Sequence, residues 1–581
     1  MKKKICFNST FLIHGLAVLL IFVLCCLNIR KLDYIAVLND EFGYWGNAAS
    51  LAGYDWKELI AETPYYAWGY SIWLVPIIIF LRTPEVWYKA AIFLNIFLLI
   101  VSYFFCCGVA KRLFSKVNKN IIYIVCFLVI IYPSNIIYVQ VAWSETLLYC
   151  LMWVATYLMI RLDEKFSYLK TVVLILVLLY MYMVHARSIG IVGIGLLCIL
   201  LIILKNKKSV FSFLCVLAIA GLGYAINNYI KGYQLSEFWS NSLVSNMNNV
   251  GLNTNTVSAY LEKFVGNFNL FLESIGGKLI YLIVATGLTI VVAIVQFAKE
   301  EIEAYRTKKI LANYNITKIW CNFAFLASWG LCSLQMLTWT DRKDIIVYSR
   351  YMENAIGPIL LLGIIYTITR IKETRIALVI SAIALLLGLR SVYWRILEAG
   401  GYFNSICSPI FGAFYDFFES DTYKAFCCIG IICALFFVLL IIATFFKREY
   451  LKYGIVLLCL FGYFIFLIKN GNIYMNEARA YFDSSTVPIK EMIVEEYNTQ
   501  EIYYIKNDKD TYSVKPKYLQ FTIPDKSIHL TTLESVANIS DEYILLVDLS
   551  DNNSIETLEK DEDAQLILTT NQLNVYEIDR E

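Results

Sequence analysis

Residues 38–56 read LNDEFGYWGNAASLAGYDW and follow closely on the apolar run 9–29. A run of about 20 apolar residues is long enough to cross a bilayer as a helix. The quoted segment differs sharply from that run, because Asp40 and Glu41 are adjacent and the aromatic Tyr44 lies close behind them. It therefore begins the loop that follows a first membrane span.

The remainder of the chain is dominated by further apolar runs. Of its 581 residues, 59% are hydrophobic and 17% are charged, whereas soluble domains are about half apolar and a quarter charged. The runs lie at residues 9–29, 88–109, 120–133, 143–160, 169–184, 188–204, 210–228, 278–297, 319–337, 355–369, 376–393, 425–446 and 452–468. They predict a polytopic α-helical membrane protein with about 13 transmembrane helices.

One further segment, residues 65–81, is short, aromatic at its start and interrupted by Pro76. Basic residues gather in six short loops, at 111–119, 161–170, 205–208, 299–318, 370–375 and 447–452. All six face the cytoplasm only if residues 65–81 do not span, and cytoplasmic loops are typically basic. We therefore expect an interfacial or re-entrant segment, an uncleaved first span with a cytoplasmic N-terminus, and an extracytoplasmic C-terminus.

The chain changes character near Gly471. From there to the end it holds 9 basic and 22 acidic residues, and its apolar runs shorten to strand length. Those runs lie at 502–505, 543–547, 566–568 and 575–578. Strands alternating with helical segments predict a small α/β domain over 471–581. The transmembrane domain is expected over 1–470, with interfacial helices in a first outer loop over 30–87.

Cysteine and histidine give little support to a disulfide framework or a metal site. Most of the 16 cysteines fall in apolar runs, where they act as small core residues. The three histidines, His14, His185 and His529, are far apart in the sequence. Because the tail is acidic and the remainder is apolar, we expect no nucleic-acid partner.

Asp40 and Glu41 are the first candidates for chemistry. Aromatic neighbours can desolvate a carboxylate, and both burial and a second carboxylate raise a carboxyl pKa. A raised pKa suits a general base that takes a proton from a hydroxyl group. The alternative is a solvated acidic turn without a catalytic role.

The acidic pair after the first span, the following Tyr44 and Ala48-Ala49, and the segment 65–81 together resemble the GT-C superfamily of glycosyltransferases. The likeness is to the protein O-mannosyltransferase and aminoarabinose transferase type, which uses polyprenyl-phosphate sugars. The resemblance implies Asp40 as catalytic base, assisted by Glu41, with Tyr44 at the substrate. The His-Pro-Pro stretch that some members carry is replaced here by residues 63–66, TPYY.

The resemblance continues at residues 132–138, YPSNIIY, and at Glu145 directly after Ser144. An ionisable residue at a membrane edge is a functional candidate, so Glu145 is expected to bind substrate. The alternative is a helix-terminal glutamate that follows a capping serine.

Arginines in the outer loops could hold the phosphate of a lipid-linked donor, because a guanidinium is a planar, permanently charged donor set. Arg187 and Arg350, the latter followed by Tyr351, are the chosen residues, ahead of Arg342-Lys343. The alternative for each arginine is snorkelling at the membrane interface.

The resemblance implies transfer of a sugar from a polyprenyl-phosphate carrier to a glycan, lipid or protein acceptor, with inversion, on the extracytoplasmic face. It implies an integral plasma-membrane enzyme of the bacterial cell envelope that works on cell-wall glycans. The resemblance implies no particular cofactor, and a divalent metal is left open because some relatives use one. Membrane lipid is a further expected partner.

Three rival functions remain open. A transporter or flippase of lipid-linked glycans would place ionisable groups near the bilayer midplane. A polymerase or ligase of such glycans would concentrate its chemistry in a late outer loop. In the third alternative, the membrane core is catalytically inactive and the C-terminal domain binds a partner. If the core is active, we expect the C-terminal domain to bind the acceptor or to support the outer mouth of the site.

Overall fold

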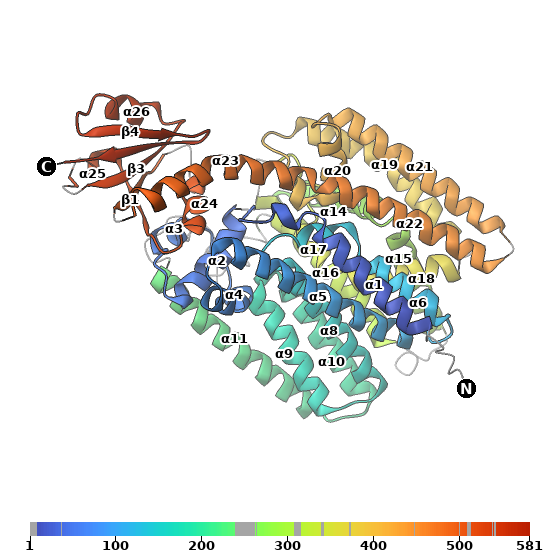
Figure 1. The fold of residues 1–581 in the computed structure, drawn as a ribbon. Coiled ribbons are helices and arrows are strands. Elements are labelled where there is room, and N and C mark those ends of the chain that lie inside the picture. The colour runs from blue at the N-terminus through green and yellow to red at the C-terminus, as the bar shows by residue number, and fades with distance from the viewer. Residues whose placement is uncertain are drawn as a thin grey trace, which may run out of the picture.

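The computed structural model describes residues 9–36, 38–238, 262, 264–306, 315–338, 342–370, 374–446, 448–498, 500–507, 513–536, 538–539 and 542–580. Most of the chain forms a bundle of helices, and a small sheet domain lies at the C-terminal end (Figure 1). Residues 239–261 and 263, which fall between the predicted spans 210–228 and 278–297, and the basic N-terminus lie outside the described residues.

Within the described residues, nine helices are long and apolar enough to cross a membrane, and four shorter apolar helices accompany them. The helices of 17 or more residues are α1 (Ser9–Cys26), α5 (Pro84–Leu113), α8 (Glu145–Glu164), α9 (Tyr168–Val184), α10 (Ile189–Lys205), α11 (Val210–Phe238), α14 (Phe268–Ala285), α15 (Thr289–Arg306), α16 (Ile316–Gln335), α19 (Arg375–Glu398), α21 (Thr422–Phe445), α22 (Glu449–Gly471) and α23 (Ile473–Glu495). Of these, α9 is one of the four shorter apolar helices, α15 and α16 are not candidate spans, and α22 and α23 together count as one of the nine. The shorter ones are α2 (Leu38–Ala52), α3 (Lys57–Ala61), α4 (Trp68–Phe80), α6 (Lys119–Ile130), α7 (Pro133–Tyr138), α17 (Arg350–Glu353), α18 (Ile356–Thr369) and α20 (Pro409–Phe417), with 3-10 turns η1 (Ile29–Lys31), η2 (Ala186–Ser188), η3 (Met336–Thr338) and η4 (Ser405–Cys407). The chain is a polytopic helical membrane protein, as predicted, while the count of 13 spans is not confirmed.

The apolar run 278–297 is not one helix. It breaks between α14 and α15, where Gly287 and Leu288 have φ values of +56° and +71°. The Leu288 N–H donates to the Ile283 carbonyl at 2.9 Å, which is the hydrogen bonding of a helix that ends in left-handed backbone. Hydropathy continues through this break, so the sequence predicted a single span.

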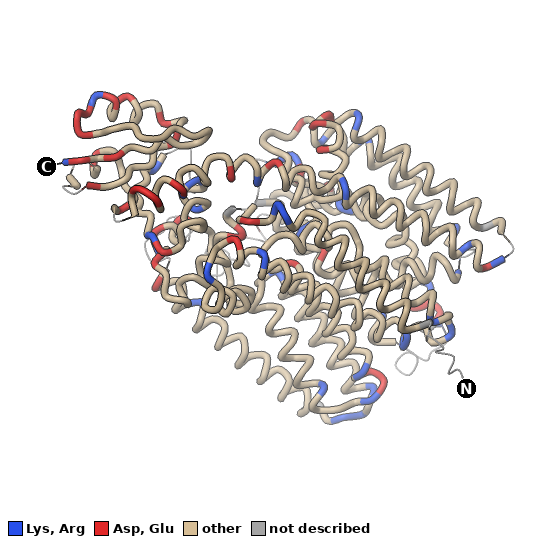
Figure 2. The backbone as a smooth tube through the Cα atoms, viewed as in Figure 1, with Lys and Arg blue, Asp and Glu red and all other residues tan. Residues whose placement is uncertain are grey.

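Charge is unevenly distributed over the bundle. Lys and Arg gather at the helix ends on the side of the N-terminus, and the long helix bodies carry few charges (Figure 2). At the opposite end both signs occur, and the C-terminal domain is edged with Asp and Glu (Figure 2). Lipid tails cannot solvate charges, so uncharged helix bodies between charged ends suit a membrane-spanning bundle.

The C-terminal domain is α/β, as predicted. Its strands are β1 (Glu501–Ile505), β2 (Ile528–Thr531), β3 (Tyr543–Asp548), β4 (Ala564–Thr569) and β5 (Leu573–Ile578), with α24 (Val514–Thr522), α25 (Leu533–Val536) and α26 (Asn552–Leu558). The strand order is β2-β1-β3-β5-β4, with β1 parallel to β2 and β3, and β5 antiparallel to β3 and β4. The strand β2 was not predicted. Helix α23 joins the domain to the bundle (Figure 1).

Candidate active site

Residues 38–52 of the segment that carries the acidic pair form α2. Phe42, Trp45 and Ala49 are fully buried along one side of it, and their spacing of three and four residues gives one apolar helix face. Asp40 and Glu41 lie in its first turn, where carboxylates interact favourably with the helix dipole. Neighbouring residues on a helix point about 100° apart, so the two carboxylates diverge.

Glu41 is directed into the protein and is fully buried. Its carboxylate accepts hydrogen bonds from the Ala36 N–H at 2.5 Å, the Ala142 N–H at 2.8 Å and the Tyr88 hydroxyl at 2.6 Å. Arg479 on α23 donates to the same Tyr88 oxygen at 3.2 Å. These contacts connect α2 to α5 and α23, and they favour an anchoring role for Glu41. Its expected assistance to Asp40 stays a prediction.

Asp40 points the other way, toward Arg350 and Tyr66. The Arg350 guanidinium forms an ion pair with one Asp40 oxygen, and the Tyr66 hydroxyl donates to the other. The close approach of Tyr66 depends on Gly43, because a Cβ at that position would lie 2.0 Å from the Tyr66 ring. Gly43 therefore lets a tyrosine reach across α2 to the carboxylate.

Asp40, Glu145, Arg187 and Arg350 form what we call the ion-pair network. Arg350 Nε lies 2.5 Å from Glu145 Oε1, and Arg187 Nη2 lies 3.0 Å from the same oxygen. The side chains of Glu145, Arg187 and Arg350 are 3%, 8% and 4% exposed, against 24% for Asp40. Two carboxylates balance two guanidiniums, which offsets the cost of burying the charges.

Arg187 has hydrogen-bonding capacity left over. Its Nε and Nη1 atoms are buried and have no hydrogen-bond partner among the described residues. The guanidinium stacks over the Tyr351 ring at 4.6 Å, which leaves its in-plane donors facing outward from the stack. A buried donor without an acceptor is costly, so this guanidinium is suited to an anion.

Aromatic side chains hold the network in place. The Arg350 guanidinium lies 3.8 Å from the centre of the Trp143 ring. The Tyr44 hydroxyl donates to Ser144 Oγ at 2.9 Å, and the Tyr44 ring packs edge-on against Tyr66 at 5.1 Å. All the residues that the sequence indicated for substrate binding, and the predicted base Asp40, thus lie within or directly beside the network, whereas the predicted catalytic helper Glu41 lies apart from it.

Four elements far apart in the sequence supply the network. Asp40 comes from α2, Glu145 begins α8, Arg187 lies in η2, and Arg350 begins α17. Helix α4 packs closely against the last turn of α9, just before η2, since a Cβ on Gly69 would lie 2.6 Å from the Met183 carbonyl oxygen. Each network residue therefore lies at the end of a helix or in a connecting turn.

The structure reverses the predicted pKa direction for Asp40. Burial alone would raise the pKa of this carboxyl, but the Arg350 charge and the Tyr66 hydrogen bond outweigh it and lower the pKa from its usual value. Asp40 is therefore ionised and already paired. The neighbouring charge expected from the sequence was Glu41, whereas the charge that lowers the pKa of Asp40 is Arg350, 310 positions away.

The C-terminal domain packs directly on α2. The Lys517 ammonium of α24 donates to Asn39 Oδ1 at 3.4 Å and to the Glu62 carbonyl at 2.9 Å. Phe521 packs against Trp45, with ring centres 5.2 Å apart, and Glu58 pairs with His529 at 2.9 Å. The helix that carries Asp40 is thus covered by residues from the far end of the chain.

A divalent metal does not fit this site. Within the described ranges, no three His, Cys, Asp or Glu residues gather as ligands. The two carboxylates of the network are each occupied by an arginine. Arg342, considered from the sequence, pairs instead with Asp344 at 2.7 Å.

Two residues beside the network, Tyr66 and Trp143, were not assigned a role from the sequence. Tyr66 lies in the stretch that departs from the expected family pattern, and the facing Gly43, three residues after Asp40, was the available signal. Trp143 immediately precedes Ser144-Glu145, and its position under a guanidinium depends on packing that the sequence does not show.

The fold of the whole chain, a helical bundle with a C-terminal domain packed on helices of the first outer loop, is similar to that of solved membrane-protein structures. The crystal structure of ArnT from Cupriavidus metallidurans bound to undecaprenyl phosphate is similar, with a TM-score of 0.53 over 97% of both chains. The same protein in the apo state gives 0.53 over 98% of both. Sequence identities are 10% and 11%, so the GT-C resemblance is confirmed for the fold. No protein-family model and no curated protein matches the sequence.

Proposed function

We propose that this protein is a membrane glycosyltransferase that moves a sugar from a polyprenyl-phosphate carrier to an acceptor on the extracytoplasmic face. The observation that carries the proposal is the unsatisfied guanidinium of Arg187 within the ion-pair network. The GT-C fold shared with a protein crystallised with undecaprenyl phosphate supports the carrier class.

The donor phosphate binds at Arg187 and Arg350. Arg187 offers two buried N–H groups that have no acceptor among the described residues, and Arg350 is held next to it by the shared Glu145 oxygen. Phosphate oxygens are strong acceptors for guanidinium groups. The phosphate competes with Asp40 for Arg350 and weakens that ion pair.

Release from Arg350 changes Asp40 from an ion-pair partner into a base. The burial of Asp40 then raises its pKa, because the opposing charge has moved to the phosphate. Tyr66 keeps its hydrogen bond to the carboxylate and fixes its orientation. Binding of donor and activation of the base are thus coupled through one arginine.

In the transfer step, the acceptor oxygen forms a bond to the anomeric carbon of the sugar. The bond from that carbon to the phosphate oxygen breaks, and its electron pair leaves with the polyprenyl phosphate. Asp40 takes the proton of the acceptor hydroxyl. The additional negative charge on the departing phosphate faces Arg187 and Arg350, which stabilise it as it develops. Direct displacement inverts the anomeric centre.

The placement of charge favours a transferase over a transporter. Asp40 lies on α2, which packs against the extracytoplasmic C-terminal domain through Lys517 and Phe521, whereas transporters place their ionisable groups near the bilayer midplane. The exposed edge of Asp40, at 24%, gives an acceptor access to the carboxylate. An enzyme working at the membrane surface needs both features.

The remaining parts of the chain take supporting roles in this proposal. Residues 1–470 form the catalytic membrane domain and 471–581 the extracytoplasmic domain, which holds α2 in position through Lys517 and Phe521. Glu41 anchors the same helix from below through Tyr88. Asp40 is then fixed from two sides relative to Arg350.

The proposal is tested by binding of undecaprenyl phosphate to the purified protein in detergent micelles. We expect Arg187→Gln to weaken binding by about tenfold or more, because one charge-assisted contact is lost. Arg395→Gln is the matched control, since Arg395 is a partly exposed arginine outside the network that pairs with Glu273 at 3.2 Å. Equal affinity of Arg187→Gln and wild type contradicts the donor site.

A further inference from the structure

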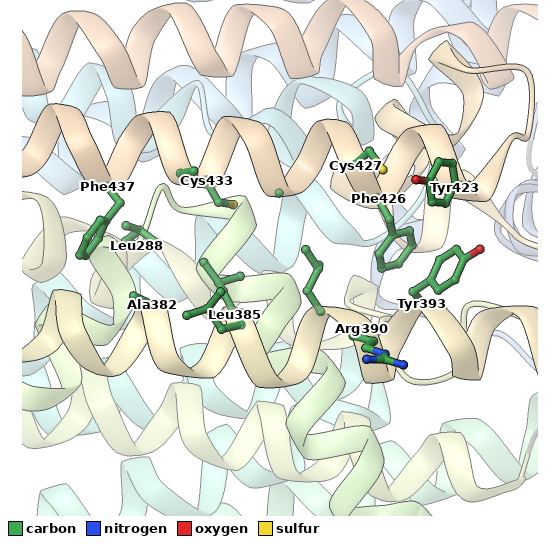
Figure 3. A pocket seen from close by; sticks show the side chains of 14 residues that line it. Leu288, Ala382, Leu385, Arg390, Tyr393, Tyr423, Phe426, Cys427, Cys433 and Phe437 are labelled. Atoms are coloured by element: carbon green, nitrogen blue, oxygen red, sulfur yellow. The ribbon is translucent and has the colours of Figure 1, made fainter.

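A large apolar groove lies between α19 and α21, away from the ion-pair network. Its volume is about 530 Å³, within the usual range of roughly 300–1,000 Å³ for ligand pockets. Leu385, Ala382, Cys433 and Phe437 line its walls, and Leu288 lies at its inner end (Figure 3). None of the residues that line it belongs to the network.

Both walls of the groove face lipid. The α19 and α21 segments are candidate membrane spans, and only 22% and 33% of their apolar windows are buried inside the protein. The two helices form the outer layer of the bundle at the edge opposite α9 and α11 (Figure 1). A groove in such a surface is open to the hydrocarbon chains of the surrounding bilayer.

One cation interrupts this apolar surface. Arg390 is exposed and lines the groove, and no hydrogen-bond or ion-pair partner for it exists among the described residues. It lies eight residues before the end of α19, which is about 12 Å at 1.5 Å per residue. Helix α19, with 24 residues, is longer than the roughly 30 Å of a span, so Arg390 lies near one edge of the hydrocarbon layer, where its side chain can reach lipid headgroups.

The neighbourhood of Arg390 resembles a headgroup site. Tyr393 and Tyr423 lie at the same end of the groove, with ring centres 6.4 Å apart (Figure 3). Tyrosines with one polar end are typical of membrane interfaces. By contrast Arg395, one turn further along α19, is already paired with Glu273. The groove thus has one cationic, hydroxyl-bearing end and a long apolar remainder.

We propose that this groove binds an anionic phospholipid of the surrounding bilayer, with the phosphate on Arg390 and one acyl chain along the walls. The phosphate supplies the counter-ion that Arg390 lacks, and its charge-assisted hydrogen bonds are strong at this depth. A bilayer phospholipid is favoured over the polyprenyl donor because the groove opens to bulk lipid and contains none of the network residues.

Native mass spectrometry of the full-length protein, delipidated in detergent and titrated with single lipids, tests this proposal. We expect one phosphatidylglycerol to be retained at concentrations where phosphatidylcholine is not. Arg390→Gln should weaken phosphatidylglycerol retention by about tenfold. Gly430→Leu should abolish it by filling the groove, since a Cβ there meets only Leu389 at 3.6 Å.

Arg375→Gln is the matched control, because Arg375 is an exposed arginine at the other end of α19. It should retain phosphatidylglycerol as wild type does. Equal retention of the two phospholipids, or unchanged retention in Arg390→Gln and Gly430→Leu, overturns the proposal. Retention of undecaprenyl phosphate in preference to phosphatidylglycerol overturns the assignment to a bilayer phospholipid.

Discussion

At the scale of single residues, Asp40 is subject to opposing influences. Burial alone would raise its pKa, while Arg350 and Tyr66 together lower it below the usual value. The free-enzyme pKa governs the pH dependence of kcat/KM. We therefore expect kcat/KM to stay level on the acid side down to about pH 4, near the ordinary pKa of aspartate.

The contribution of Asp40 to the free energy of unfolding should also decrease at acid pH. The folded-state pKa of Asp40 is lowered, so its contribution is present above the unfolded pKa of about 3.9 and is lost as the pH falls through the folded value. Initial rates between about pH 4 and pH 8 check the kinetic part of this prediction. A fall of kcat/KM centred near about pH 6 and traced to Asp40 would contradict it.

Substitution of Asp40 separates its two proposed roles. We expect Asp40→Asn to reduce transfer by about 10²–10⁴-fold, the usual contribution of a general base. Binding of undecaprenyl phosphate should tighten, because a competing anion for Arg350 is removed. Asp33→Asn is the control on the same loop, since Asp33 is exposed and pairs with Lys89. Full transfer activity in Asp40→Asn excludes the base role.

The sequence named Asp40, Glu145, Arg187 and Arg350 from four separate loops, and these residues meet in one network. These residues could be named because their position in outer loops and their likeness to GT-C motifs can be read from short stretches of sequence. The direction of Glu41 and the pairing of Asp40 depend on how helices are rotated and packed. Those features, and the resulting pKa, were therefore beyond sequence reasoning.

At the scale of elements, α24 of the C-terminal domain supports α2. Phe521 is fully buried and contacts Trp45, Trp56 and Tyr88 through its ring. Truncation of a buried phenylalanine costs about 3–5 kcal/mol. We expect Phe521→Ala to speed hydrogen exchange of the α2 amides and to lower transfer, as measured by exchange mass spectrometry and activity assays.

A surface position on the same domain provides the comparison. Leu566 on β4 is 48% exposed, so Leu566→Ala should leave exchange in α2 and transfer unchanged. If Phe521→Ala leaves α2 as protected as in wild type, the supporting role of α24 is wrong.

Two elements show the limits of the sequence. The break between α14 and α15 is hidden because Leu288 and its neighbours continue the apolar run, while only their backbone conformation changes. The strand β2 has four residues and carries the half-exposed His529, so it lacks the apolar length that marked the other strands. Both features arise from tertiary packing.

At the scale of the whole molecule, the charge pattern predicts an orientation in the membrane. Basic residues gather at the bundle end near the N-terminus, and the acidic C-terminal domain lies at the other (Figure 2). In intact cells we expect Asn553→Cys to react with a membrane-impermeant thiol reagent. Lys208→Cys, also exposed, should react only after permeabilisation, and the reverse pattern would refute the predicted topology.

The class of the whole fold was readable from composition, because apolar runs of span length leave few alternatives. The number of spans was not, since helices such as α4 and α6 are apolar but short. Whether a short apolar helix crosses the bilayer depends on its neighbours. The orientation rests on six loops and stays a prediction.

The contact between Lys517 and Asn39 joins residues 478 positions apart. Translation proceeds at about 5–20 residues per second. Helix α24 is therefore synthesised roughly half a minute or more after α2. A nascent chain, or one ended early by a stop codon, can hold all four network residues and still lack the helix that fixes the first of them. The site therefore depends on a late segment of the chain, and only a chain translated through α24 acquires the helix that holds it.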